Sequence, residues 1–252
     1  MQDSVPAALL QKWKTLTVYC RFFMRTEDTL LPALLGQISN SAADWLQSAQ
    51  DLAATGSVQD LLGVYPQASR YLGRQPFVLS EPDSHTWNRL THEDVGRLLL
   101  LLARYRAQPA SEDVDAAATE CFEQGDSREQ QSWMRTVAWL PQPVRFLPLV
   151  IDTCRTNILP LFEAVACENV YPSQYFPDRN FNQVVLKAMF NGVALARIVG
   201  LDFRRNAELS RMASDYADER RAAGRSIPAD ISLALLDPPT TLGASDAQRT
   251  HA

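Results

Sequence analysis

The spacing of the apolar residues is the sequence feature that most constrains the fold. No segment alternates apolar and polar residues over several positions, which is the pattern of a half-buried β-strand. Apolar residues recur instead three or four positions apart, as on the buried face of an amphipathic helix. The spacing predicts helices over 7–24, 41–54, 111–124, 145–156, 158–167, 179–191 and 207–223, and two more that begin after Thr91 and Asp126. The chain is therefore expected to be all-α.

Turn residues and capping residues divide these helices. The N-cap candidates are Ser41, Thr91, Asp126 and Asn206, and the glycines expected just past a helix end are Gly56, Gly125 and Gly224. Shorter helical pieces are expected over 61–72, with breaks at Gly63 and Pro66. Residues 73–90 are expected to form a long connection, because glycine and proline there disfavour a regular element.

The close spacing of turns between residues 111 and 166 predicts short antiparallel helices. This pattern favours an irregular, right-handed HEAT-like array, an α-solenoid of antiparallel helices. The repeats are too degenerate to align, so an irregular helical bundle is the alternative. We expect a single helical domain over 1–236, and a disordered tail over 237–252, which is rich in Pro, Thr, Ser, Gly and Ala.

Composition and charge argue against several classes of protein. The 252 residues carry a net charge of −5, which disfavours a general nucleic-acid binder because phosphate binding needs a basic surface. The longest apolar run, 98–103, is too short to cross a bilayer, and the N-terminus does not have the pattern of a secretory signal. We expect reduced cysteines at Cys20, Cys121, Cys154 and Cys167, a cytoplasmic location and no direct membrane insertion.

The sequence contains none of the motifs that would identify a reaction. Glycine-rich phosphate loops, the G-x-S-x-G elbow and the H-E-x-x-H zinc motif are all missing from it. Its three histidines are His85, His92 and His251, whereas catalytic zinc usually has three protein ligands. His85 and His92 are better interpreted as a loop residue and a helix N-terminal residue. We expect no metal, no cofactor and no assigned catalytic residue.

The most unusual stretch is Glu168–Asp178 together with the helix that follows it. The stretch places two prolines, three aromatic residues and both carboxylate and amide side chains in one connection, which we expect to be non-helical over Tyr171–Pro177. On a helical wheel of 179–191, Asn182 falls inside the apolar arc, and Gln183 and Lys187 lie one turn apart at another edge. A buried amide must find hydrogen-bond partners or cost about 1–3 kcal/mol.

Three interpretations of this stretch remain open. In the first, Asn182 and Gln183 hold the irregular loop on the helix, and Lys187 pairs with Glu163 or Glu168. In the second, the same groups surround a ligand pocket with aromatic walls, a common design for small-molecule sites. The candidate ligand-binding residues are Arg155, Asn157, Glu163, Glu168, Asn169, Tyr171, Tyr175, Asn182, Gln183 and Lys187. In the third, Lys187 and Glu168 or Glu163 form an acid–base pair of an enzyme.

Several motifs in the segment 155–225 resemble the EboA family. They are Arg155-Thr-Asn157, Phe162-Glu-Ala164, Glu168-Asn-Val-Tyr-Pro172, Phe176-Pro177, Phe181-Asn-Gln-Val-Val-Leu-Lys-Ala188, Arg197-Ile-Val-Gly-Leu-Asp202, Asn206-Ala-Glu-Leu209, Asp215-Tyr-Ala217 and Glu219-Arg220. The chain differs from the family pattern at Val170, where proline is frequent, and at Asp218, where histidine is frequent.

The resemblance implies a cellular context more than a mechanism. EboA proteins are encoded in clusters for secondary metabolism, beside a UbiA-like prenyltransferase and several soluble enzymes, and the clusters are associated with precursor processing or export. The resemblance therefore implies a non-catalytic helical adaptor or ligand-binding protein for a prenylated or aromatic precursor. Its implied partners are other proteins of the cluster, such as the prenyltransferase, and a small-molecule precursor. The alternative is an enzyme that acts on such a precursor.

Overall fold

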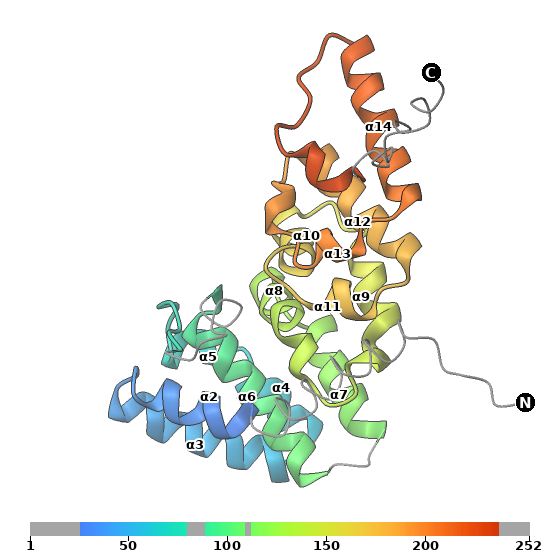
Figure 1. The fold of residues 1–252 in the computed structure, drawn as a ribbon. Helices are drawn as coiled ribbons and strands as arrows, with labels where there is room; N and C mark the ends of the chain where they lie inside the picture. Colours follow the sequence, from blue (N-terminus) through green and yellow to red (C-terminus); the bar gives the residue numbers. More distant parts are fainter. Residues whose placement is uncertain (1–25, 80–88, 109–111, 237–252) are drawn as a thin grey trace, which may run out of the picture. The chain divides into compact units, whose positions relative to one another are not determined.

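The computed structural model describes residues 26–79, 89–108 and 112–236, and the regular structure in these ranges is helical (Figure 1). The only pairing of strand type described is one isolated antiparallel bridge between Pro76 and Thr91. The prediction of an all-α protein is confirmed, while the HEAT-like arrangement stays a prediction. The predicted helix 7–24 and the predicted tail 237–252 lie outside the described residues.

The chain divides into two compact units, with the boundary between Phe176 and Pro177. This boundary falls inside the motif-bearing segment 155–225. The expectation of a single domain over 1–236 stays a prediction, and each unit is described by itself below.

Unit 1 consists largely of helices. They are α2 (Thr26–Leu35), α3 (Asn40–Thr55), α4 (Val58–Val64), α5 (Ala68–Tyr71), α6 (His92–Ala107), α7 (Glu112–Glu123), α8 (Ser127–Thr136), α9 (Leu147–Thr153), α10 (Leu159–Ala166) and α11 (Tyr171–Tyr175), with the 3-10 turns η2 (Val137–Trp139) and η3 (Pro143–Phe146). Residues 74–79 belong to the predicted long connection and form no helix.

Helix α6 is the centre of unit 1. It packs against α2, α3, α5, α7 and α8, and every residue from His92 to Tyr105 is buried. A helix that is covered on all sides would normally be apolar throughout. Its middle is apolar, with an unbroken run of leucines at 98–102, but its first turns carry buried Glu93, Asp94 and Arg97. These charged groups must therefore be paired inside the unit.

Local capping rules set several helix starts, as the sequence predicts. Asp94 and Thr91 form a capping box at the start of α6, in which the Asp94 N–H donates to the Thr91 hydroxyl and the Asp94 carboxylate accepts the Thr91 N–H. Asp126 forms the same arrangement with Glu129 at the start of α8. The prediction for α3 was wrong by two residues, because Ser39 and not Ser41 accepts the first free N–H.

Three other predictions in unit 1 need correction. Helix α2 has no counterpart among the predicted helices, and it carries Pro32 within its span. Gly63 does not break a helix, since it lies within α4. The segment Tyr171–Pro177 was expected to be non-helical, yet Tyr171–Tyr175 forms α11. Pro172 lies in the first turn of α11, where a missing N–H costs nothing.

Unit 2 is a smaller helical group. It contains α12 (Asp178–Asn191), η4 (Leu195–Arg197), α13 (Leu201–Arg204), α14 (Ala207–Ala222) and η5 (Ile231–Ala234). Helix α12 packs against α14, and η5 contacts α13, α14 and η4. Gly192 ends α12 with φ +68°, a left-handed conformation that suits glycine. Asn206 caps α14, as predicted, by accepting the N–H of Leu209 at 2.9 Å.

Two helical glycines provide a matched test of the packing around α6. A Cβ added at Gly96 of α6 would lie 2.0 Å from Cδ1 of the buried Leu72, whereas a Cβ added at Gly63 of α4 would meet no atom within 4 Å. Alanine favours a helix over glycine by about 1 kcal/mol. We expect Gly63→Ala to raise the free energy of unfolding by up to that amount. Gly96→Ala should lower it by about 1 kcal/mol or more, because Leu72 must move in a filled core.

Chemical denaturation of the two single variants measures this difference. Equal stability of Gly96→Ala and Gly63→Ala would show that α6 does not depend on its close approach to Leu72.

Candidate functional site

The ten predicted ligand-binding residues are divided between the two units. Arg155, Asn157, Glu163, Glu168, Asn169, Tyr171 and Tyr175 belong to unit 1, and Asn182, Gln183 and Lys187 lie on α12 of unit 2. That these residues surround one pocket stays a prediction, as does the pairing of Lys187 with Glu163 or Glu168.

Asn169 holds the connection between α10 and α11 in place. It is 2% exposed, and its amide nitrogen donates to the carbonyls of Met134 and Ala164, each at 2.9 Å. Its amide oxygen accepts the N–H of Tyr171, also at 2.9 Å. The preceding residue, Glu168, has φ +49°, so the chain turns sharply at this point. These bonds perform, inside unit 1, the role of loop anchor that the sequence analysis gave to Asn182.

Tyr171 belongs to the core of unit 1. Its side chain is fully buried, and its hydroxyl donates to the Pro143 carbonyl at 2.7 Å. Its ring lies against the rings of Tyr175 and Phe176. Burial raises the pKa of the Tyr171 hydroxyl, and the neighbouring Tyr175 raises it further. Packing and hydrogen bonding inside unit 1 therefore account for the position of Tyr171.

The other candidates in unit 1 lie closer to solvent. Arg155 forms an exposed ion pair with Asp152 at 2.8 Å, one turn earlier in the chain, and Asn157 is also exposed. Pairs of this kind contribute little to stability. Glu163, Glu168 and Tyr175 are half-buried.

Helix α12 has the apolar arc that the sequence predicts, and Asn182 lies within it at 3% exposure. The partner of Asn182 was predicted wrongly. Its amide nitrogen donates to Oδ1 of Asn206 at 3.1 Å, and its amide oxygen accepts from Nδ2 of Asn206 at 2.9 Å. Since Asn206 is also the N-cap of α14, this reciprocal amide pair fixes the start of α14 to the side of α12.

A groove of about 770 Å³ lies beside this amide pair, between α12 and α14. Its lining residues are Asp178, Arg179, Asn182, Gln183, Asn206, Ala207, Glu208, Arg211 and Met212. Its charges are largely paired locally, because Arg211 bonds both Glu208 and Asp215. The hydrogen bond from Arg211 lowers the pKa of Glu208. Two of the predicted residues, Asn182 and Gln183, therefore line a surface depression of mixed charge.

A second groove, which we call the aromatic groove, was not anticipated from the sequence. It has a volume of about 500 Å³ and is lined by Met189, Phe190, Gly192, Val193, Ala194, Tyr216, Arg220, Ser226, Ile227, Pro228, Ala229 and Asp230. The Phe190 ring is 61% exposed and meets the edge of the Tyr216 ring, with centroids 4.7 Å apart. One exposed ring and one buried ring on the facing sides of two helices were the available sign in the sequence, but the turn at 226–230 completes the groove.

Two polar groups interrupt the apolar wall of the aromatic groove. The Arg220 guanidinium lies 5.9 Å from the centre of the Tyr216 ring, and its Nε donates to the Ser226 carbonyl at 2.8 Å. The Asp230 carboxylate accepts the Leu195 N–H at 2.6 Å. The groove therefore offers aromatic and apolar contacts beside one guanidinium and one carboxylate.

The described residues 26–79, 89–108 and 112–236 contain no group of three or more His, Cys, Asp and Glu side chains placed to hold a metal ion. Among the helices in these ranges, none is long and apolar enough to cross a membrane.

These features define an all-helical protein with two surface grooves in unit 2. A family profile with the description "Metabolite traffic protein EboA" matches residues 26–235, which is most of the chain. The chain therefore belongs to the EboA family. The members of that family are described as metabolite traffic proteins. No curated protein and no solved structure matches the chain significantly.

The two buried asparagines make a testable contrast with the exposed Gln183. Asn182→Leu leaves the amide of Asn206 without its partner, so we expect a loss of about 1–3 kcal/mol in the free energy of unfolding. Asn169→Leu removes three hydrogen bonds and should cost at least as much. Gln183→Leu, one residue along α12, should change stability by about 0.5 kcal/mol or less. Denaturant unfolding of the three variants tests this order, and a neutral Asn182→Leu contradicts it.

Proposed function

We propose that this protein binds an apolar or aromatic metabolite without transforming it, and passes it between the steps of a metabolite traffic pathway. The observation that carries the proposal is the aromatic groove. It combines the exposed ring of Phe190, a floor that includes Tyr216, and the charged groups of Arg220 and Asp230 at its edge. Family membership supports the same direction, because the family is described by metabolite traffic.

The proposed cargo follows from the chemistry of the groove. Apolar contact along Met189, Val193 and Ile227 would bury a hydrocarbon or ring, and Phe190 offers a face for stacking. Arg220 would orient an oxygen-bearing end of the molecule. A prenylated or aromatic precursor has both an apolar part and an oxygen-bearing end. The proposed partners are proteins of the same pathway, such as a UbiA-like prenyltransferase, and the proposed place of action is the cytoplasm.

Purification of the protein from a host that runs the pathway, followed by solvent extraction and mass spectrometry, tests whether it carries a metabolite. Ala229→Trp fills the groove and should abolish carriage. Ala222→Trp, on the exposed end of α14 and outside the groove, is the matched control and should retain it.

Phe190→Ala removes one aromatic wall and should weaken binding of the extracted compound about three- to tenfold. Phe203→Ala removes a ring that is 70% exposed in the same unit but does not line the groove, and it should leave binding unchanged. If the protein carries no compound, or if all four variants carry the wild-type amount, the proposal fails.

A second candidate function is catalysis on the precursor, with Lys187 and Glu168 or Glu163 as an acid–base pair. The observation that favours it is the half-buried position of Lys187 on α12, one turn after Gln183. Lys187→Met should then abolish pathway output while the variant stays folded, as judged by circular dichroism and thermal unfolding. Normal output from a folded Lys187→Met variant would exclude this function.

A further inference from the structure

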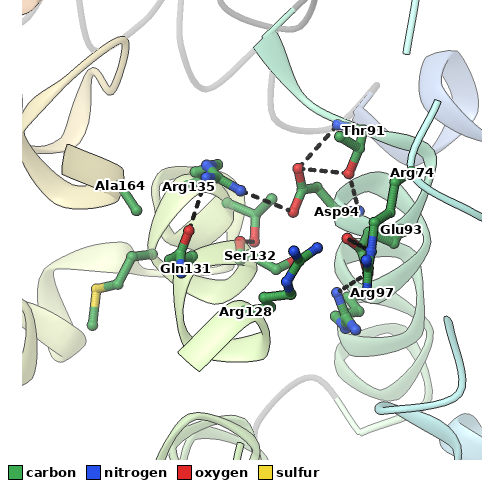
Figure 2. A network of polar contacts seen from close by, with 12 residues as sticks. Arg74, Thr91, Glu93, Asp94, Arg97, Arg128, Gln131, Ser132, Arg135 and Ala164 are labelled. Atoms are coloured by element: carbon green, nitrogen blue, oxygen red, sulfur yellow. Dashed lines mark hydrogen bonds and ion pairs between the residues drawn. The ribbon is translucent and has the colours of Figure 1, made fainter. Parts of the chain in front are cut away.

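The charged cluster between α6 and α8 of unit 1 has features that neither family membership nor the proposed metabolite groove explains. Figure 2 shows Arg128, Ser132 and Arg135 on the side of α8 that faces Glu93, Asp94 and Arg97 of α6. Arg74 approaches Glu93 from the connection after α5. With the buried Glu129 at the start of α8, the cluster therefore has four arginines and three carboxylates, which leaves an excess of one positive charge.

The two carboxylates are already occupied by protein groups. Glu93 accepts from Arg97 at 3.1 Å and lies 3.3 Å from Nε of Arg74. Asp94 accepts from both the N–H and the hydroxyl of Thr91 at 2.9 Å, and its other oxygen lies 3.6 Å from Arg135. The nearby Glu129 accepts the Asp126 N–H at the start of α8. The oxygens of Glu93, Asp94 and Glu129 therefore already accept hydrogen bonds or ion pairs from groups of the protein.

The cluster between α6 and α8 has more N–H and O–H donors than its acceptors can use. The Ser132 side chain is fully buried, and its hydroxyl has no hydrogen-bond partner. The guanidinium of Arg128 has no hydrogen bond or ion pair within the described residues. Arg97 is 1% exposed and has five N–H groups. One of them donates to the Glu93 carboxylate and one to the Tyr65 carbonyl. A buried hydroxyl with no partner is costly, and in native proteins it commonly marks the place of a bound water or ion.

We propose that this cluster binds the phosphoryl group of a small phosphorylated molecule. A phosphate ester carries a charge of about −1.5 to −2 at pH 7 and three strong acceptor oxygens, so it can accept from several of these donors at once, whereas a carboxylate has one charge and two oxygens. Guanidinium groups bind phosphate oxygens in pairs, and the Ser132 hydroxyl supplies a further donor. Arg128 is exposed and Arg135 is partly exposed, so the ligand enters from their side, and buried Arg97 lies behind them.

Inorganic phosphate and pyrophosphate are the probes that test this site, in calorimetric titrations of the full chain against sodium chloride and sodium acetate at matched ionic strength. We expect binding of both phosphate probes and no saturable binding of chloride or acetate. Arg128→Gln and Arg135→Gln should each weaken binding about tenfold or more, because each removes a charge-assisted hydrogen bond. Ser132→Ala, which removes one buried hydroxyl, should weaken it several-fold.

Arg106→Gln is the matched control. Arg106 lies on α6, is exposed and pairs with Glu27 outside the cluster, so its variant should bind phosphate as tightly as the wild type. The proposal is overturned if phosphate and pyrophosphate do not bind, if acetate binds as tightly as phosphate, or if the three cluster variants retain wild-type affinity. Since the site lies in unit 1 and the aromatic groove in unit 2, the Phe190→Ala and Ala229→Trp variants should keep phosphate binding, which separates this proposal from the proposed function.

Discussion

The burial of charged groups in the first turns of α6 is the constraint on which unit 1 depends. Helix α6 contacts helices on every side, and its apolar middle could slide or rotate among them with little change in buried area. Glu93 and Asp94 prevent this, because a buried carboxylate displaced from its partners costs several kcal/mol. Arg97, Arg135 and the capping Thr91 therefore fix the register of α6 relative to its neighbours, and the leucines supply the bulk of the burial.

The parts of the fold that follow from local rules could be predicted from the sequence. Helix α12, the cap at Asn206 and the capping boxes at Thr91 and Asp126 depend on residues within one turn of each other. The errors arose where the local signal was ambiguous. Ser39 and Ser41 are equally good caps by type, and Pro172 interrupts or begins a helix according to its position in the first turn.

The candidate site was harder to predict, because the partners of its polar groups lie far away in the sequence. A helical wheel places Asn182 in the apolar arc of α12, and the structure buries it there, but nothing near it in the sequence points to Asn206, 24 residues later. Asn169 likewise bonds the Met134 carbonyl, which is 35 residues earlier. The aromatic groove depends on the course of the chain at 226–230, where no periodic pattern exists.

The amide pair between Asn182 and Asn206 also makes the contact between α12 and α14 sensitive to deamidation. Each amide serves the other as both donor and acceptor, so both hydrogen bonds of the pair form only while both nitrogens are present. Hydrolysis of either amide to a carboxylate replaces an N–H donor with an acceptor and places two oxygens face to face. The loss of a single ammonia molecule, with water added in its place, would therefore remove one of the two hydrogen bonds between α12 and α14 and set two oxygens against each other beside the one that remains.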